Sequence, residues 1–388
     1  MSDKWDFLYL GLRPSPLEWR AELDAATRLG HGVQVLSDAD LGHVSLPGVR
    51  TGAFRWRAEA AECAKEIVAG LRRPPAVVTC WGDRYVRLTA HVADALGLRG
   101  PGLAAATTCG DKVAQRRALE PCGLNPWWRP GSTIADLRAA VTGPPQAAGL
   151  VFKLAHTSGG LGIRFVTPGC DLEEIVRSAS LNYVPSPAFV VEEFAEGSEH
   201  SVAGVAGEGS IVVLGVTDKT VGEDLRTHTT VFPSALPGPR LEEVVRAAEA
   251  AVRAVGLCSG GFHVDLRLTT TGPVVLEVGA RLGGDLINSH LVPLATGGRT
   301  RPYEAVLEVL ATGRLPAPPR VTGAAGMLVL PAHETRTITG IPQVSAVTDW
   351  SAPESAQVAV VVVADDTAAL EAAMEEVRQH ASTSTRRC

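Results

Sequence analysis

The sequence predicts an α/β protein that changes to an α+β arrangement after its first quarter or so. Short apolar runs of strand type alternate with amphipathic helices over about residues 1–105, which is typical of a parallel α/β unit. A strand–loop–strand unit follows at residues 150–166, and strands at 261–268 and 274–278 are joined by a tight turn. With 388 residues, the chain is long enough for two or three domains with buried cores.

The first 105 residues show the alternation most clearly. Apolar residues at helical spacing, beginning at Leu17 and Trp19, predict the first helix, and Gly30 is placed to end it. No G-x-G-x-x-G pattern follows the first strand, so we do not expect a dinucleotide site there. Strands are expected at residues 7–12, 33–36 and 76–80, and helices at 16–29, 58–71 and 83–96.

The rest of the chain reads as helices and antiparallel strands. A polar tail at residues 382–388 is expected to fray. Strands are expected at 150–154, 163–166, 189–194, 201–205, 211–216, 261–268, 274–278, 324–329 and 358–363. Helices are expected at 111–122, 172–180, 241–255, 302–311 and 367–380, with a short one inside 131–149.

Composition narrows the class of partners. A hydrophobic content of 45%, a charged content of 20% and a net charge of −6 argue against a broad nucleic-acid or anionic-membrane surface. No run of 18 apolar residues appears, and the start lacks the features of a secretory signal. Seven scattered cysteines suit free thiols. We therefore expect a cytoplasmic protein that acts on small molecules, with neither nucleic acid nor membrane as a partner.

The stretch of residues 274–285 reads Val-Val-Leu-Glu-Val-Gly-Ala-Arg-Leu-Gly-Gly-Asp. Glu277 lies in an apolar run typical of a strand, and Arg281 and Asp285 follow this run in the sequence. A carboxylate at a strand end can hold a cation, and an arginine can bind a phosphate or carboxylate bidentately. A strand that ends in a Gly-rich turn with incidental charges explains this stretch equally well.

Lys153 ends an apolar strand and precedes a loop that contains Ser158, Gly159 and Gly160. Glycines let backbone N–H groups approach phosphate oxygens, and the lysine supplies a positive charge. A plain hairpin would look the same. The loop does not end in Gly-Lys-Ser/Thr, which disfavours a P-loop NTPase.

Asp265 and Glu277 lie on two strands joined by a tight turn, and alternation along each strand can aim both carboxylates at one point. Two carboxylates that converge with a phosphate oxygen are a usual way to hold Mg²⁺. Taken alone, Lys112 and the acids Glu192, Glu193 and Glu199 suit a solvated surface.

In this order along the chain, the motifs resemble the ATP-grasp superfamily over roughly residues 105–310. The resemblance rests on Asp111-Lys112, Phe152-Lys153 with Ser158-Gly-Gly, Val190-Val-Glu-Glu-Phe-Ala-Glu-Gly-Ser-Glu199, Asp265, and Glu277-x-x-x-Arg281. It implies an ATP-grasp fold with an N-terminal parallel α/β pre-grasp domain. The implied domains are a pre-grasp domain at 1–105, a linker helix and first grasp subdomain at 106–188, a second at 189–312 and a C-terminal α+β subdomain at 313–388.

The resemblance also implies roles for single residues. Lys112 and Lys153 match lysines that contact ATP phosphates, and Ser158, Gly159 and Gly160 match a flap over them. Glu199 matches an acid that binds the ribose. The segment that matches the adenine hinge consists of Glu192, Glu193, Phe194 and Ala195. Asp265 and Glu277 match the carboxylates that bind Mg²⁺, with Mn²⁺ as an alternative. Arg281 matches an arginine near the reacting acyl group, and Lys153 and Arg281 would serve catalysis.

Two positions depart from the superfamily pattern. Many members have Glu where this chain has Asp265, which is one methylene shorter. Many also have Asn two residues after the second acid, where this chain has Gly279. The missing amide removes one metal ligand and puts the number of metal ions in question.

The resemblance implies an ATP-dependent carboxylate–amine ligase that forms an amide through an acylphosphate, most like the branch that joins L-amino acids or makes natural products. Its partners would be a small carboxylate and an amine, and a homodimer is also implied. Arg281, Gly284, Asp285, His228 and His263 are candidate substrate residues, although a structural role is open for both histidines. A carboxylase-type or purine-pathway ATP-grasp enzyme and a non-catalytic nucleotide-binding module are the alternatives.

Overall fold

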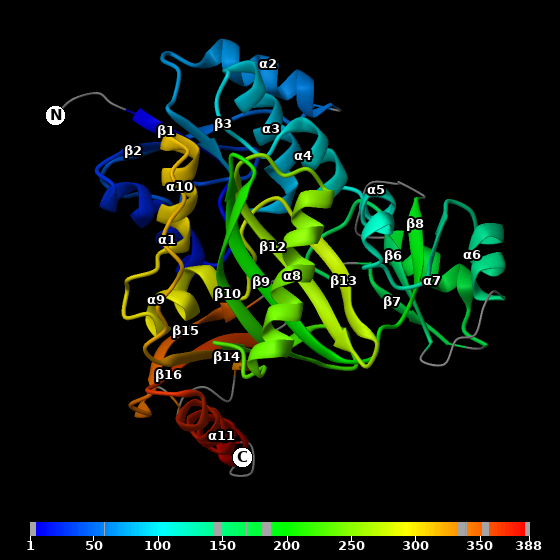
Figure 1. Ribbon diagram of the computed structural model, residues 1–388. Helices are drawn as coiled ribbons and strands as arrows, with labels where there is room; N and C mark the ends of the chain where they lie inside the picture. Colours follow the sequence, from blue (N-terminus) through cyan, green and yellow to red (C-terminus); the bar gives the residue numbers. More distant parts are fainter. Residues whose placement is uncertain are drawn as a thin grey trace.

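The protein is described here by a computed structural model (Figure 1). The described residues are 5–57, 59–142, 149–160, 162–167, 169–180, 188–332, 338, 340–350 and 357–384. Three sheets organise this part of the chain.

The N-terminal sheet is parallel, with strand order β3-β2-β1-β4. This confirms the predicted alternation of strands and helices. Strand β3 was not predicted, because its sequence Val-Arg-Thr-Gly-Ala lies largely exposed at the sheet edge and shows no apolar run. The elements are β1 (Trp5–Leu10), α1 (Pro16–Arg28), β2 (Gly32–Ser37), β3 (Val49–Ala53), α2 (Ala60–Gly70), β4 (Val77–Thr79), η1 (Asp83–Tyr85) and α3 (Val86–Ala95).

A small antiparallel sheet follows, with order β5-β8-β6-β7, and it stands at the right of Figure 1. The rings of Phe152 and Phe189 pack 4.9 Å apart in its core. Its elements and the helices before it are α4 (Leu103–Cys109), α5 (Lys112–Leu119), η2 (Glu120–Cys122), β5 (Trp128–Gly131), α6 (Ile134–Val141), β6 (Leu150–Leu154), β7 (Arg164–Val166), α7 (Leu172–Ser180) and β8 (Phe189–Glu193).

The third sheet has eight strands in the order β13-β12-β9-β10-β11-β14-β16-β15 and is antiparallel throughout. Strands β11 and β15 were not predicted, because neither carries the apolar run of its neighbours. The elements are β9 (Ser198–Gly207), β10 (Ser210–Val221), β11 (Thr227–Phe232), α8 (Gly238–Ala254), β12 (Gly260–Thr269), β13 (Gly272–Gly279), the π-helix η3 (Ile287–Leu291), α9 (Val292–Ala295), α10 (Pro302–Thr312), β14 (Ala324–Pro331), β15 (Val344–Trp350), β16 (Gln357–Ala364) and α11 (Thr367–Ser384).

Helix α8 covers one face of the long strands β9, β12 and β13 (Figure 1). Its apolar side, with Val244, Ala248 and Val252, packs against Phe262 and Val264 of β12. Side chains alternate along a strand, so the polar residues of these strands point to the opposite face. That face carries the predicted site residues.

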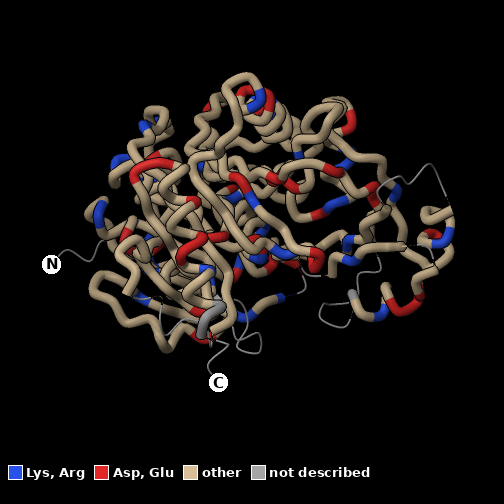
Figure 2. Tube along the Cα trace, turned by 90° about the horizontal axis from the view of Figure 1, so that it is seen from below, with Lys and Arg blue, Asp and Glu red and all other residues tan. Residues whose placement is uncertain are grey.

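Charges of both signs are interspersed along the described chain (Figure 2). Within the described residues, no helix combines the length and apolar character needed to cross a membrane.

We expect Phe262→Ala to lower the free energy of unfolding by about 3 to 5 kcal/mol, because it empties a ring-sized space between β12 and α8. Urea unfolding followed by far-UV circular dichroism measures this. The control is Arg246→Ala on the exposed side of α8, which should change stability by no more than about 0.5 kcal/mol. Equal effects of the two substitutions would contradict the packing role of Phe262.

Candidate functional site

The Glu192 carboxylate of β8 is buried between two cations. Its Oε1 lies 2.5 Å from Arg116 Nε, and its Oε2 lies 2.7 Å from Lys153 Nζ. Burial alone would raise the pKa of Glu192, but Arg116 and Lys153 hold it down at about 2. Burial also lowers the pKa of Lys153, against the opposing effect of Glu192. Glu192 therefore fixes the position of Lys153.

Arg116 links this acid to the strand that carries Glu277. Its guanidinium donates to the carbonyls of Val275 at 2.8 Å and Leu276 at 2.7 Å, just before Glu277 on β13. Arg116 lies one helical turn after Lys112 in α5, so both side chains project from the same side of that helix. One helix thus positions two cations of the site.

Lys112 joins the glycine-rich turn. Its Nζ donates to the carbonyl of Thr157, and the Ser158, Gly159 and Gly160 turn follows directly. Gly159 and Gly160 have φ values of +65° and +71°, which glycine adopts without strain. The residue after Gly160 lies outside the described residues. Lys112, Lys153 and the turn are therefore close together, as a phosphate site requires.

The predicted hinge connects the small sheet to the large one. The backbone N–H of Glu193 donates to the carbonyl of Trp127 at 2.9 Å, and that of Phe194 donates to the carbonyl of Gly149 at 3.0 Å. These two N–H groups already have partners within the protein. An adenine ring at this hinge would need to use other groups.

Arg267 of β12 contacts the hinge residues Phe194 and Ala195 and the acid Glu199 that follows them. Its guanidinium lies 4.4 Å from the ring centroid of Phe194 and donates to the Ala195 carbonyl at 3.0 Å. It also pairs with the Glu199 carboxylate at 3.0 Å. Burial, followed by the negative charge of Asp265, raises the pKa of Glu199. Glu199 is therefore oriented by Arg267 at the edge of the site.

Asp265 and Glu277 are cross-strand partners on β12 and β13, as the sequence predicted for two converging carboxylates. The Nζ of Lys219, on β10, lies 3.2 Å from an Asp265 oxygen and 3.0 Å from an Asp285 oxygen. Burial alone would lower the pKa of Lys219, but Asp265 and Asp285 raise it above its ordinary value. Lys219 thereby holds the Asp265 pKa at about 2, although burial alone would raise it.

These carboxylates have the chemistry of a Mg²⁺ site. Carboxylate oxygens suit Mg²⁺, which commonly takes one or two of them and completes its shell with phosphate oxygens and water. Within the described residues, the Glu277 carboxylate has no hydrogen-bond or ion-pair partner, and no three His, Cys, Asp or Glu side chains cluster as a metal site. Asp265 and Glu277 therefore suit a metal ion that takes its remaining ligands from the phosphates of a nucleotide and from water.

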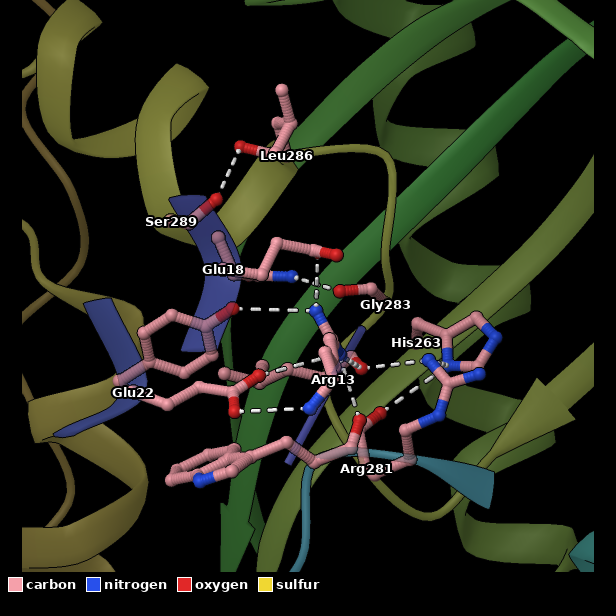
Figure 3. A network of polar contacts seen from close by, with 12 residues as sticks. Arg13, Glu18, Glu22, His263, Arg281, Gly283, Leu286 and Ser289 are labelled. Carbon is pink, nitrogen blue, oxygen red and sulfur yellow. Dashed lines mark hydrogen bonds and ion pairs between the residues drawn. The ribbon is translucent and has the colours of Figure 1, made fainter. Parts of the chain in front are cut away.

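Arg281 is held from two sides (Figure 3). Its Nε donates to Asp83 at 2.8 Å in a bidentate ion pair, which joins the β12–β13 end to the N-terminal unit. Its Nη1 donates to the Leu282 carbonyl at 2.7 Å. Burial would raise the pKa of Asp83, but Arg281 lowers it to about 2. The Nδ1 atom of His263 lies 3.2 Å from the Arg281 carbonyl.

The unusual Gly279 has a physical cause. His263 and Gly279 are cross-strand partners, and a Cβ atom at position 279 would lie 2.0 Å from His263 Cε1 and 2.3 Å from His263 Nδ1. The imidazole thus occupies the space from which an asparagine side chain would start. Burial and the charge of Arg281 lower the pKa of His263, so the ring is neutral at pH 7.

The remaining predicted substrate residues lie in different places. Asp285 contacts Lys219, and both Asp285 and Leu286 have left-handed φ values of 58° and 55°, which are uncommon for residues other than glycine. Gly284 is half-buried immediately before them. The exposed His228 pairs with Asp224 at 3.4 Å, so its contact is with a neighbouring loop residue rather than with Asp265 or Glu277.

Sequence reasoning missed four charged residues of this site, namely Asp83, Arg116, Lys219 and Arg267. The helical spacing of Lys112 and Arg116 was the one available signal for Arg116. Register places Lys219 opposite Glu199, and Glu199 opposite Arg267, on three adjacent strands. That pairing cannot be read from the sequence without knowing which strands are neighbours.

We expect Gly279→Asn alone to destabilise the protein, because the new side chain must displace the His263 ring. The double variant His263→Gly/Gly279→Asn should recover at least half of the lost melting temperature, because the ring is gone. Differential scanning fluorimetry measures both variants.

His263→Gly serves as the matched control, since it shows what loss of the ring alone costs. If Gly279→Asn melted like the wild-type protein, the proposed exclusion between the two side chains would be wrong.

Comparisons with known proteins agree on one type of domain. A family model described as the ATP-grasp domain matches residues 168–289. Carnosine synthase 1 of Gallus gallus is 30% identical over 247 residues, which are 58% of this chain and 26% of that protein. The alanine–anticapsin ligase of Bacillus subtilis strain 168 is 26% identical over 233 residues, covering 53% of this chain and 48% of that protein.

Among solved structures, the L-amino acid ligase from Bacillus licheniformis has a TM-score of 0.79 at 21% identity and covers 98% of both chains. This chain spans less than half the length of the two curated relatives above. Residues 168–289 therefore match an ATP-grasp domain, and the curated relatives named above are a carnosine synthase and an alanine–anticapsin ligase.

Proposed function

We propose that the protein is an ATP-dependent carboxylate–amine ligase that forms an amide bond and releases ADP and phosphate. One observation carries this proposal: Lys219, the Asp265–Glu277 pair and Arg281 gather at one end of the β12–β13 hairpin. The relatives named as a carnosine synthase and an alanine–anticapsin ligase support the same reaction class, as does the similarity in fold to an L-amino acid ligase. We place ATP between the small sheet and the large one, at Lys112, Lys153 and the glycine-rich turn.

The residues divide the work of phosphoryl transfer. Lys112, Lys153 and Lys219 would neutralise the negative charge of the phosphates as the γ-phosphoryl group moves to a substrate carboxylate oxygen. Asp265 and Glu277 would hold Mg²⁺, which supplies further positive charge at the phosphates when it is bound. Ser158 and the following glycines would cover the phosphates and exclude water.

Amide formation then takes place beside Arg281. The amine nitrogen attacks the acyl carbon of the acylphosphate and loses a proton, the C–N bond forms, and the C–O bond to phosphate breaks. The guanidinium of Arg281 would stabilise the developing oxyanion. Because Asp83 already orients Arg281 through a bidentate ion pair, the guanidinium needs little reorganisation.

We propose amino acids as the substrates. An amino acid carries an ammonium and a carboxylate group on one carbon. The site contains two ion pairs, each of one carboxylate and one cation, namely Asp83 with Arg281 and Asp285 with Lys219. The Asp285–Lys219 pair can exchange its internal partner for an end of the substrate, whereas Asp83 keeps Arg281 in place. His263 faces Arg281 and is proposed to support it rather than to bind substrate. Among the described residues, His228 contacts Asp224, which does not favour a substrate role.

We also propose domain boundaries at residues 105, 188 and 312. The first separates the parallel sheet from helix α5 and the small antiparallel sheet. Strands β14 to β16 extend the same sheet as β9 to β13, so the segment 313–388 would be a lateral extension of the second grasp subdomain.

We expect ADP release by the purified protein to depend on Mg²⁺ and on a pair of free L-amino acids. A coupled ADP assay over all pairs of the twenty amino acids, with mass spectrometry of the products, measures this. The product should weigh the sum of the two substrates less one water molecule.

Glu277→Ala should lower turnover on the order of 100-fold, because it removes one Mg²⁺ carboxylate, while ATP should still bind. Bicarbonate-dependent turnover without an amide product would favour a carboxylase instead. ATP binding without turnover with any pair would favour a non-catalytic module.

A further inference from the structure

Arg13 lies in the loop between β1 and α1 and is buried in a polar network next to Arg281 (Figure 3). Its Nε donates to the Trp81 carbonyl at 2.9 Å, and its Nη2 donates to the Leu282 carbonyl at 2.5 Å. Its Nη1 donates to Glu18 at 2.8 Å and to the Tyr303 hydroxyl at 3.2 Å. Four acceptors on four different segments therefore converge on one side chain.

The two carbonyls bound by Arg13 adjoin the two ends of the Asp83–Arg281 ion pair. Trp81 precedes Asp83 by two residues, and Leu282 directly follows Arg281. The Leu282 carbonyl also accepts a hydrogen bond from Arg281 Nη1 at 2.7 Å. Two guanidinium groups thus share one acceptor, and Arg13 holds both loops that carry the pair.

Acids beside Arg13 balance this accumulation of positive charge. Glu18 forms a direct ion pair with Arg13, and the fully buried Glu22 has an oxygen 3.6 Å from Arg13 Nε. Burial raises the pKa of Glu22 to about 8 despite the opposing effect of Arg13. A buried arginine with a dedicated acid and three further acceptors is expensive to desolvate unless all of its contacts are kept.

We propose that Arg13 is a positioning residue that fixes the Arg281 guanidinium against Asp83 and thereby sets its place at the acyl site. This inference rests on the proposed ligase function. Arg13 touches neither the lysines nor the carboxylates of the proposed ATP and Mg²⁺ sites. It acts on the amide-forming end of the reaction through the Trp81 and Leu282 carbonyls, and Glu18 and Tyr303 orient its guanidinium for these two contacts.

Lysine cannot take over this role. A planar guanidinium reaches acceptors in several directions at fixed angles, whereas an ammonium is a single point with three donors. Arg13→Lys should therefore keep the charge beside Glu18 but lose the simultaneous grip on the Trp81 and Leu282 carbonyls.

The experiment compares Arg13→Met, Arg13→Lys and wild-type protein, using the amino-acid pair that the wild type converts fastest. Both variants should lose about 10- to 100-fold in kcat, the loss expected when a reacting group is displaced by about 1 Å. The KM for ATP and the affinity for a non-hydrolysable ATP analogue should change less than about twofold, because the Arg13 contacts lie away from Lys112 and Lys153.

The matched control is Arg28→Met. Arg28 also joins α1 to α10, through Glu304 at 2.6 Å, but it touches neither loop of the Asp83–Arg281 pair. Its kcat should stay within about twofold of the wild type. If Arg13→Met does not fold, Tyr303→Phe serves instead, since it removes one Arg13 acceptor and keeps the ring. A loss of kcat with an unchanged KM for ATP would support the proposal. An unchanged kcat would overturn it.

A double-mutant cycle tests whether Arg13 acts through Arg281. Arg13→Met should cause little further loss in an Arg281→Met background, because the group it positions is absent. Equal losses in both backgrounds, or a parallel loss of ATP affinity, would overturn the proposal.

Crystal structures separate this inference from the proposed function. In Arg13→Met, the contact between Arg281 Nε and Asp83 Oδ1, which is 2.8 Å in the wild type, should lengthen or break. An unchanged contact overturns the positioning role whatever reaction the wild type catalyses. A displaced contact in a protein without ligase activity would support the positioning role and reject the ligase proposal.

Discussion

The site depends on one buried carboxylate, that of Glu192 between Arg116 and Lys153. A buried charge is tolerated only when it is paired, and removal of one partner from such a pair typically costs about 3 to 5 kcal/mol. Loss of Glu192 would leave two buried cations without an acid. Because Arg116 also holds the backbone before Glu277, the same contact connects the proposed phosphate lysine to the proposed metal strand.

The same constraint recurs at the other end of the site. Lys219 is neutralised by Asp265 and Asp285, and Arg281 by Asp83. In the absence of ligand, Lys219 and Arg281 therefore each have an internal acid partner. A phosphate or carboxylate of a substrate would exchange with the acid partners of Lys219 rather than enter an unpaired positive pocket. Such a site can remain folded when it is empty and still bind anions, because each exchange replaces one ion pair by another.

Much of this arrangement could be predicted from the sequence. The contacts that could not be predicted have one physical reason in common. Apolar periodicity predicted the parallel N-terminal unit and the β12–β13 hairpin, and motif order predicted Lys112, Lys153, Asp265 and Glu277. Motifs do not specify which distant segments meet. Asp83 pairs with a residue 198 positions away, and Lys219 with one 46 positions away. These contacts arise from strand order and from the docking of the N-terminal unit, which local patterns do not encode.

Gly279 shows how a departure in sequence can point to a contact in space. The glycine was visible as an anomaly, and the structure supplies its partner, since the His263 ring fills the position of the missing side chain. The proposed metal site is thereby left with the carboxylates of Asp265 and Glu277 as its protein ligands. Two carboxylates leave most of an octahedral Mg²⁺ shell to phosphate oxygens and water. Asp265 and Glu277 would then hold the metal together with phosphate oxygens of a bound nucleotide.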